Sequence, residues 1–376
     1  MPAKYRVAVV GTGRVGALWE TDPPTGASHG GAFFVQPECE LIAGANRRRD
    51  RLDEFGRRFG VRGLYQDYGE MLRQERPDIV CVATHPGSHA GIIESAVRNG
   101  AKAIFCEKPM ALDLADCDRI IDVCTSHGVL LSVNHSRRWY PIFRHARELI
   151  RQGAIGELVS ITGYCQGGKP SPAWQSALEG PLLHDATHLF DLMRFYAGDV
   201  EWLAATALRR KHTAYPVEDD STALLSFHSG VTAVALVNEL TDYVRFEIDL
   251  QGTQGMLRLG MDTFEIARAK PVTFEAAREE TPDFEWQVLE AEPLPEMPSA
   301  QPFAIAAREL VDALEGRASI SSTGEDGRAS MEIIMAIYES QRRGNVPVHL
   351  PLPAGPSSLV ALAQEQGWDR SERAAL

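Results

Sequence analysis

Five short apolar segments in the first 135 residues alternate with helical patterns, and this alternation restricts the fold more than any other feature of the chain. Such nearly continuous apolar runs are typical of strands buried on both faces of a parallel sheet. Strand–helix alternation at this spacing predicts an open, doubly wound sheet, which binds ligands at the carboxyl ends of its strands. The predicted strands are Val7–Val10, Leu41–Ala45, Ile79–Ala83, Ala103–Cys106 and Val129–Val133.

Candidate caps support the helices between these strands. Asp67, Ser88 and Asp113 precede helical patterns, where a side-chain oxygen can accept hydrogen bonds from the first N–H groups of a helix. Gly100 and Gly128 follow two of the patterns, where a residue in the left-handed conformation commonly ends a helix. The helices are expected over 68–73, 89–99 and 114–126.

A different pattern follows residue 135. Short alternating segments separated by glycine turns occupy residues 201–259, which favours a mostly antiparallel sheet. Residues 271–302 are rich in Pro and Glu and are expected to be irregular. Helices are expected over 142–151, 183–196, 303–314 and 327–340, a strand over 158–164, and a Pro-rich tail from Pro351.

These patterns predict an α/β protein with two domains. The first is a Rossmann domain with a doubly wound parallel sheet, and the second is an α/β domain with a large, mostly antiparallel open sheet. The predicted bounds are 1–135 for the Rossmann domain, 136–352 for the second domain and 353–376 for a C-terminal tail.

The composition excludes some classes of binding partner and indicates the cellular compartment. A formal net charge of −13 without a basic tract argues against nucleic acid or an anionic membrane as partner. No run approaches the roughly 18 apolar residues of a membrane span, and no export signal is recognisable at the N-terminus. Six cysteines without CxxC spacing, several of them in apolar runs, are typical of buried reduced thiols. We therefore expect a cytoplasmic protein.

A glycine-rich turn directly follows the first predicted strand. In Gly-x-Gly-x-x-Gly, the first glycine permits a tight bend, the second lets a pyrophosphate approach, and the third lets helix and strand pack closely. The N–H groups at the start of the next helix then face the phosphates. In this context the motif predicts a dinucleotide site, and a structural turn without a cofactor is the alternative. Its residues are Gly11, Thr12, Gly13, Arg14, Val15 and Gly16.

The end of the second strand bears on the choice of cofactor. An acidic residue there would hold the ribose hydroxyls of NAD, but this chain has Asn46 followed by three arginines. No carboxylate repels a 2′-phosphate, and Arg47 or Arg48 can pair with one. We therefore expect NADP rather than NAD as cofactor. The alternative is that the arginines open the next helix and face water.

Residues Glu20–Gly31 interrupt the helix expected after the glycine turn. Two adjacent prolines and three glycines cannot continue a helix, so an inserted loop near the cofactor end is expected. One hypothesis is that this loop covers the bound dinucleotide. No role is assigned to His29 within it.

Cys106-Glu107-Lys108-Pro109-Met110 follows the predicted strand 103–106, at the edge where a Rossmann fold places its ligands. A lysine at this edge can donate a hydrogen bond to a substrate hydroxyl and stabilise a developing alkoxide. The alternative is a surface Glu–Lys pair at a strand end.

A second candidate cluster lies on the helix predicted over 183–196. His184 and His188 are four residues apart and share a helix face, with Asp185 nearly on the same face. Histidine titrates near neutral pH, so it is suited to accept the proton that an alcohol loses as hydride leaves its carbon. A zinc site is disfavoured because no third ligand has metal spacing and HExxH is absent. Histidines that cap or pack within the helix are the remaining alternative.

The order of these motifs resembles the glucose–fructose oxidoreductase / inositol dehydrogenase / MocA (Gfo/Idh/MocA) family over nearly the whole chain. The most specific mark is Glu107-Lys108-Pro109 after a strand. The resemblance is carried by Gly11–Gly16, Thr84–His89, Glu107–Pro109 and His184–Asp191, and it extends through the helix at 303–314 to the segment at 348–352.

The resemblance implies a nicotinamide-dependent oxidoreductase that reversibly oxidises a hydroxyl of a sugar, cyclitol or related polyol. It implies that Lys108 touches substrate and nicotinamide, and that Thr84, Pro86 and His89 line the cofactor cleft, with Glu107 beside them. It also implies a homodimer or homotetramer that assembles through the open sheet of the second domain.

The helix motif departs from the family pattern. Many members carry Asp-x-Gly-x-His, whereas here His184 takes the place of the aspartate, Asp185 lies one step later and Ala186 replaces the glycine. The general base is either His188 alone or a His184–His188 pair. We expect His188 as base or acid, Lys108 as its electrostatic partner and His184 as a substrate contact. Asp185 either orients one of the histidines or points away.

Two other functions compete with a dehydrogenase. One is a redox-neutral enzyme, such as a glycosidase that oxidises and re-reduces one carbon, and the other is a non-catalytic nucleotide-bound regulator. The substrate pocket is expected to be lined by Trp139, Tyr140, Trp174 and the loop 167–176. Arg137 and Arg138 either bind an anionic group of the substrate or form an ion pair with the following helix, and we favour the ion pair.

Overall fold

The computed structural model describes residues 4–167, 179–212, 216–261, 263–272, 286–293, 297–353 and 355–368. The chain folds into two compact units. Unit 1 contains Met1–Tyr140, Ser299–Met335 and Pro353–Ser357, and unit 2 contains Pro141–Pro298, Ala336–Leu352 and Ser358–Leu376. None of the helices in the described ranges is long and apolar enough to pass through a membrane.

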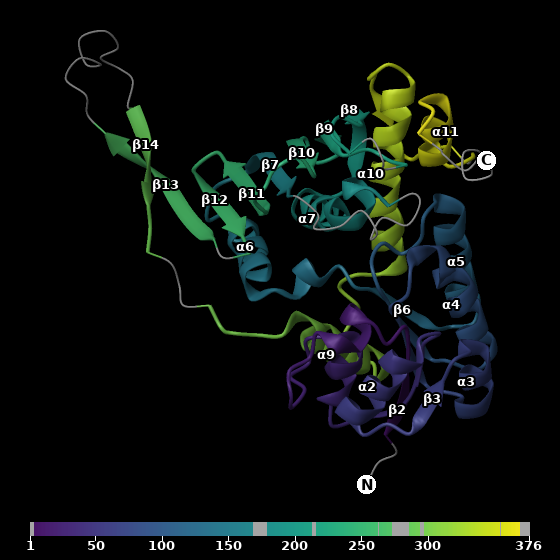
Figure 1. The fold of residues 1–376 in the computed structure, drawn as a ribbon. Coiled ribbons are helices and arrows are strands. Elements are labelled where there is room, and N and C mark those ends of the chain that lie inside the picture. Colours follow the sequence, from purple (N-terminus) through teal and green to yellow (C-terminus); the bar gives the residue numbers. More distant parts are fainter. Residues whose placement is uncertain are drawn as a thin grey trace, which may run out of the picture. The chain divides into compact units, whose positions relative to one another are not determined.

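The sheet of unit 1 confirms the predicted doubly wound fold. Over the described residues it has six strands in the order β3-β2-β1-β4-β5-β6, and all neighbouring strands are parallel (Figure 1). This is the Rossmann strand order, in which the carboxyl ends of all strands meet at one edge. The strands are β1 (Tyr5–Val10), β2 (Cys39–Ala45), β3 (Gly63–Tyr65), β4 (Ile79–Val82), β5 (Ala103–Cys106) and β6 (Leu130–Val133).

Helices cover both faces of this sheet (Figure 1). On one face lie α3 (Tyr68–Glu75), α4 (His89–Arg98) and α5 (Leu114–Ser126), which contact one another in sequence order. The other face carries α1 (His29–Phe34), α2 (Arg49–Phe59) and α9 (Pro302–Leu314). α9 comes from the far end of the chain, and it contacts α1, β5 and β6.

Two of the three predicted caps form. Asp67 Oδ1 accepts a hydrogen bond from the Glu70 amide, and Asp113 Oδ1 accepts one from the Asp116 amide. The prediction for Ser88 was wrong, because its hydroxyl donates to the carbonyl of His85 and makes no capping bond to α4. Gly100 and Gly128 have φ angles of 91° and 65°, the left-handed conformation expected of them.

An apolar core joins α9 to the strands. Ala306, Ala307, Leu310 and Val311 on one side of α9 pack in a buried cluster that includes Phe105 of β5. Burial of one large apolar side chain contributes about 1.5–3 kcal/mol, so this contact fixes α9 firmly to unit 1. Trp139, which the sequence placed in the substrate pocket, is fully buried in the same cluster.

The helix after the glycine turn is interrupted, as predicted, but the loop is shorter than Glu20–Gly31, because His29, Gly30 and Gly31 form the first turn of α1. A single π-helical turn, η1 (Arg14–Leu18), is followed by a loop, and α1 starts at His29. The buried Glu20 organises this loop, since its carboxylate accepts hydrogen bonds from the amides of Thr25, Gly26 and Ser28 at 2.6–3.1 Å. A carboxylate that accepts several backbone N–H groups holds a loop in one conformation.

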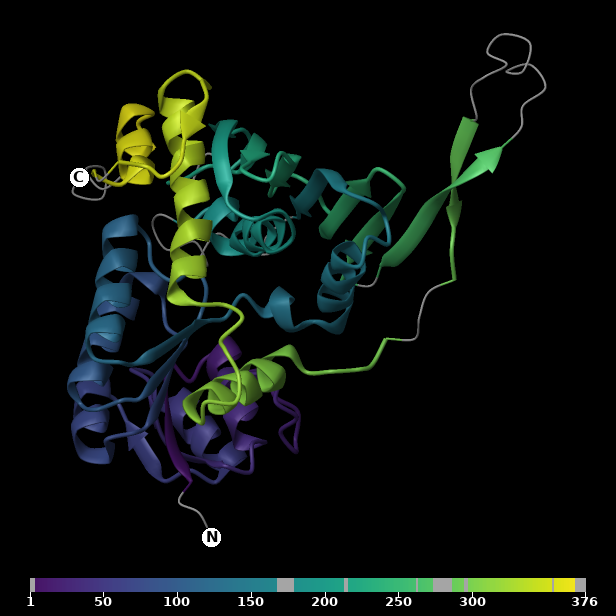
Figure 2. The same ribbon diagram turned by 180° about the vertical axis from the view of Figure 1, so that it is seen from behind.

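Unit 2 contains the second predicted sheet (Figure 2). Within the described residues it has nine strands in the order β14-β13-β12-β11-β7-β10-β9-β8-β15, antiparallel except for the β10–β7 pair. The strands are β7 (Leu158–Gln166), β8 (Val200–Leu208), β9 (Asp220–Phe227), β10 (Thr232–Asn238), β11 (Arg245–Gly252), β12 (Gly255–Gly260), β13 (Phe264–Val272), β14 (Trp286–Ala291) and β15 (Val348–His349).

One face of this sheet packs on helices. α7 (Thr187–Ala197) contacts β7, and α6 (Pro141–Arg151) contacts β12. The strands alternate between fully buried and partly exposed residues, the pattern of a sheet with one covered face. α10 (Gly324–Arg342) begins in unit 1 and ends in unit 2.

Two segments that were expected to lack regular structure each contain a helix or strand. β14 forms inside the segment expected to be irregular, and pairs with β13 through Trp286–Ala291. Its six residues are all exposed, so no buried alternation marks it in the sequence. The predicted tail contains α11 (Ser358–Glu365), whose Leu359, Leu362 and Ala363 are buried.

Candidate active site

The glycine turn has the geometry that its sequence predicts. Gly11 has a φ of 95°, and a Cβ added there would lie 2.4 Å from the Ala83 carbonyl oxygen. A Cβ at Gly16 would lie 1.8 Å from the Gly11 carbonyl oxygen. A side chain at either position would therefore collide with backbone, which explains why the turn requires glycine at both.

The surroundings of Gly13 suit a dinucleotide. A Cβ there would meet only the guanidinium of Arg51, at 3.0 Å, so the backbone of the turn is open to a ligand. Thr12 is fully buried, and its hydroxyl has no hydrogen-bond partner among the described residues. A buried hydroxyl in this position needs a partner, and a bound pyrophosphate would supply one. Sequence reasoning missed Arg51, because its position in α2 does not show which residue its side chain reaches.

The predicted 2′-phosphate site is only partly available. The Arg48 guanidinium pairs with Asp50 at 2.5 and 3.1 Å, and its amide donates to Asn46 Oδ1. Both side chains of the Arg48–Asp50 pair are exposed. Of the two arginines proposed for the phosphate, Arg48 is thus already paired, while Arg47 is exposed next to Asn46.

The loop after β4 is shaped by side-chain hydrogen bonds. Ser88 Oγ donates to the His85 carbonyl, so in the 2.8 Å contact with Thr84 the Thr84 hydroxyl is the donor. His89 is fully buried, with Nε2 at 3.0 Å from the Thr84 carbonyl and Nδ1 at 3.1 Å from the Met110 carbonyl. His89 thus links this loop to the segment after β5. Pro86 is buried at the start of the 3₁₀ turn Pro86–Ser88.

Glu107, which follows β5 directly, has a largely buried carboxylate. Its Oε2 accepts hydrogen bonds from His29 Nε2 at 2.8 Å and Asn134 Nδ2 at 2.7 Å. Burial alone would raise the pKa of Glu107, but the contacts with His29, Lys108 and Asn134 outweigh burial and hold the pKa below its usual value. Glu107 is therefore ionised at neutral pH. Lys108, its neighbour, is half-buried.

In unit 2, the backbone around His184 and His188 is not the regular α-helix that the sequence predicts. Residues Leu182–Ala186 form a π-helical turn, η5, before α7 begins at Thr187. The sequence argument assumed a regular α-helix through His184 and His188, and the wider turn means that four-residue spacing does not set their faces. His184 Nδ1 lies 2.8 Å from Asp185 Oδ1, so Asp185 orients His184. His188 is buried in the first turn of α7.

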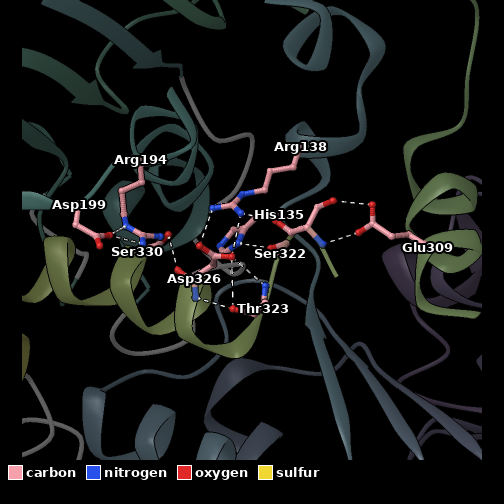
Figure 3. Close-up of polar contacts among 10 residues, drawn as sticks. His135, Arg138, Arg194, Asp199, Glu309, Ser322, Thr323, Asp326 and Ser330 are labelled. Carbon is pink, nitrogen blue, oxygen red and sulfur yellow. Dashed lines mark hydrogen bonds and ion pairs between the residues drawn. The ribbon is translucent and has the colours of Figure 1, made fainter. Parts of the chain in front are cut away.

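Arg138 forms an ion pair, as favoured, but with a different partner. Its guanidinium contacts both oxygens of Asp326 at 2.9 and 3.1 Å, and Asp326 lies in α10 rather than in the following helix (Figure 3). Arg138 also donates to the Ser321 carbonyl, and Glu309 of α9 accepts from the Ser321 amide and hydroxyl. Arg137 Nη1 donates to the Ser136 hydroxyl, and its guanidinium lies 5.7 Å from the ring centre of Tyr140.

These placements settle which predicted residues come together. The carboxyl edge of the unit 1 sheet gathers the glycine turn, Asn46, Thr84, Glu107 and Lys108. Trp174 and loop residues 168–176 lie outside the described residues. Within the described ranges no group of three or more His, Cys, Asp and Glu side chains is placed to hold a metal ion.

A buried acid that sequence reasoning missed supports η5. Glu218 is fully buried, and its carboxylate contacts the Leu182 amide at 3.1 Å and the Tyr338 hydroxyl at 2.9 Å. Gly180 allows the approach, since a Cβ there would lie 2.4 Å from Glu218 Oε1. In the sequence this residue belongs to an acidic run that resembles a solvated turn. Glu218 thus anchors the start of the segment that carries His184 and Asp185.

Family models match both parts of the chain. Residues 5–135 match an oxidoreductase family with an NAD-binding Rossmann fold (GFO_IDH_MocA), and residues 143–258 match the GFO/IDH/MocA C-terminal domain. D-apiose dehydrogenase from Paraburkholderia graminis is 30% identical over 322 residues, which cover 81% of this chain and 82% of that protein. The chain belongs to the Gfo/Idh/MocA family. The resemblance found in the sequence is therefore confirmed.

Two further proteins of known name extend this likeness. The scyllo-inositol 2-dehydrogenase (NAD(+)) of Bacillus subtilis is 26% identical over 361 residues, covering 93% of this chain and 97% of that protein. The WlbA dehydrogenase of Bordetella pertussis, solved in complex with NADH and UDP-GlcNAcA, matches with a TM-score of 0.76 at 24% identity. The match covers 94% of this chain and 99% of that chain, and it shows a common fold.

In this Gfo/Idh/MocA oxidoreductase, Glu218 should make stability depend on pH. Burial raises the pKa of Glu218 to about 7; the contacts with Leu182 and Tyr338 offset this only in part, and the nearby Glu239 adds to it. The native state then binds this proton more tightly than the unfolded state, so stability falls as pH rises from about 4.5 to above 7. Complete ionisation would cost on the order of 3 kcal/mol.

Urea denaturation at pH 5 and pH 8 measures this effect. In Glu218→Gln the fall in unfolding free energy between the two values should shrink relative to the wild type. Replacement of the exposed Glu201 by Gln is the matched control, and it should leave the fall in unfolding free energy between the two pH values as in the wild type. An equal fall in wild type and Glu218→Gln would show that Glu218 does not hold a proton in the folded state.

Proposed function

We propose that the chain is an NAD(P)-dependent dehydrogenase that transfers hydride between nicotinamide and a hydroxyl-bearing carbon of a sugar, cyclitol or related polyol, in either direction. The observation that carries this proposal is the placement of Lys108 two residues after the end of β5, at the sheet edge that also holds the glycine turn after β1. The names of the apiose and scyllo-inositol dehydrogenase relatives support a sugar or cyclitol as substrate.

The residues at this edge fit a dinucleotide. Thr12 and the open backbone at Gly13 would hold the pyrophosphate, with the Arg51 guanidinium beside them. Asn134 Oδ1 is buried without a partner among the described residues, and it can accept a hydrogen bond from the bound cofactor. Thr84 and Pro86 would border the same ligand. When bound, the nicotinamide supplies the hydride acceptor or donor.

The protein's own contribution to the chemistry is charge and proton transfer. The Lys108 ammonium would donate a hydrogen bond to the reacting oxygen and stabilise its negative charge as hydride leaves the carbon. His188 would accept the hydroxyl proton in oxidation and return it in reduction. His184, oriented by Asp185 at 2.8 Å, would contact another hydroxyl of the substrate.

We further propose three finer properties. The cofactor preference is for NADP, because no carboxylate side chain follows β2 directly and Arg47 is exposed there. The protein is a homodimer or homotetramer through the open face of the unit 2 sheet, where Leu224 is 44% exposed between Ala204 of β8 and Val234 of β10. It acts in the cytoplasm, which suits buried thiols such as those of Cys81, Cys106 and Cys117.

A substrate panel with a His188 variant tests the reaction. Sugars, inositols and sugar acids are supplied with NAD and NADP, and absorbance at about 340 nm is followed. Net formation of reduced nicotinamide with at least one of these compounds supports a dehydrogenase, whereas turnover without net reduced nicotinamide supports the redox-neutral alternative.

His188→Asn should lower kcat by about 10² or more if His188 transfers the proton. A loss of less than tenfold in a folded protein would remove His188 from this role.

The cofactor preference is tested at Arg47. Arg47→Ala should lower kcat/KM for NADP by about tenfold, because a charge-assisted hydrogen bond to the phosphate is worth about 1.5–3 kcal/mol, and should leave NAD nearly unchanged. Arg48→Ala is the matched control, with a smaller effect since Arg48 is paired with Asp50. A wild-type enzyme with higher kcat/KM for NAD than for NADP would contradict the preference.

The assembly is tested at Leu224. Leu224→Arg places a charge at the centre of the proposed interface and should shift the protein to monomers in analytical ultracentrifugation. Val159→Arg serves as the control. Val159 is similarly exposed, at 49%, but it lies near the start of β7, away from Leu224 and its neighbours Ala204 and Val234. Sedimentation of Leu224→Arg identical to wild-type oligomer would exclude this face as the interface.

A further inference from the structure

His29 is a buried histidine for which the sequence suggested no role. Its side chain is fully buried at the start of α1, and Nε2 lies 2.8 Å from Glu107 Oε2. A carboxylate oxygen can only accept, so Nε2 carries the hydrogen that joins the two side chains. His29 therefore binds the residue that precedes Lys108, from a segment 78 positions away in the chain.

Asn134 binds the same carboxylate oxygen from another direction. Its Nδ2 lies 2.7 Å from Glu107 Oε2, and the carboxylate fixes which end of the amide is the nitrogen. Asn134 follows β6, and Glu107 follows β5. Three chain segments thus meet at one carboxylate, and two N–H groups hold it in place.

The His29 ring has little freedom to move. It contacts the rings of Phe105 and Phe303, with centroids 4.6 and 5.5 Å away. The backbone before it is fixed by the Glu20 carboxylate, which binds the Ser28 amide, and by Ser28 Oγ, which accepts from the Gly31 amide. The loop over residues 20–28 therefore delivers His29 to Glu107 in one orientation.

Among the described residues, four titratable groups interact electrostatically with the Glu107 carboxylate. They are His29 from α1, Lys108 beside it in the chain, His89 from α4 and the Cys106 thiol of β5. Burial opposes ionisation of the carboxylate. The contacts with His29, Lys108 and Asn134 outweigh burial, so the pKa of Glu107 is lowered. The result is a fixed negative charge next to the Lys108 ammonium.

We propose that His29 is a positioning residue of this oxidoreductase. Together with Asn134 it fixes the Glu107 carboxylate, and Glu107 in turn fixes the backbone and charge environment of Lys108. The inference rests on the proposed role of Lys108 in hydride transfer. The loop over residues 20–28 then serves the reaction through His29.

Two amide variants test the hydrogen bond with little change in polarity. The Nε2 of glutamine reaches about as far as Nε2 of histidine, whereas the Nδ2 of asparagine reaches only as far as Nδ1. His29→Gln should keep the bond to Glu107, and His29→Asn should lose it. Asp67→Ala, which removes the cap of α3 and leaves the loop over residues 20–28 and the imidazole intact, controls for a loss of stability alone.

Three measurements distinguish a role of His29 in positioning Glu107 from a role in protein stability alone. His29→Asn should lower kcat about tenfold or more, with cofactor KM changed much less, and should move the acid limb of kcat/KM to higher pH, because Glu107 then protonates more easily. Without substrate, the ¹³Cδ signal of Glu107, assigned by its absence in Glu107→Gln, should titrate at higher pH than in the wild type. His29→Gln and Asp67→Ala should resemble the wild type in all three.

Other outcomes overturn the proposal at identifiable steps. If His29→Asn and Asp67→Ala lose stability alike, with the acid limb and the ¹³C titration unmoved, His29 is only structural. Lys108→Met separates the two claims: if it stays active, the proposed function of Lys108 fails. If it is inactive while His29→Asn keeps wild-type kcat and pH profile, only the role of His29 fails.

Discussion

The parallel arrangement of six strands in unit 1 is the constraint on which the rest of the proposed site depends. Parallel neighbours end at the same edge, so segments far apart in the chain meet there. The glycine turn follows β1, Asn46 follows β2, Thr84 follows β4, Glu107 follows β5 and Asn134 follows β6. The hydrogen bond from Asn134 to Glu107 is a direct product of this topology.

The carboxylates of Glu107, which is largely buried, and Glu218, which is fully buried, show how neighbouring groups decide ionisation. Burial opposes charge in both, since a charged group loses hydration in the protein interior. Glu107 has donors from His29 and Asn134 and the positive Lys108 beside it, so its pKa is lowered. Glu218 has one amide and one hydroxyl as donors and Glu239 nearby, and its pKa rises to about 7. The first suits a fixed charge at the site, and the second a neutral anchor for η5.

The fold was largely predictable from sequence, because apolar runs and glycines act locally. Short-range patterns predict five of the six described strands of unit 1 (all except β3), the roles of Gly11 and Gly16, and the interruption after the glycine turn. The contact of His29 with Glu107 and the pairing of Arg138 with Asp326 depend on which distant segments meet. No spacing in the sequence encodes them. The π-helical turn at Leu182–Ala186 was missed because apolar periodicity does not distinguish it from an α-helix.

The claim that the carboxyl edge of the unit 1 sheet binds the dinucleotide is tested most directly by hydrogen–deuterium exchange with and without reduced cofactor. Amides that a bound ligand covers or rigidifies exchange more slowly. We expect protection at the ends of β1, β2, β4, β5 and β6, within residues 11–18, 46–51, 84–89, 107–110 and 134–136. Protection confined to other segments, or none at saturating cofactor, would contradict this account.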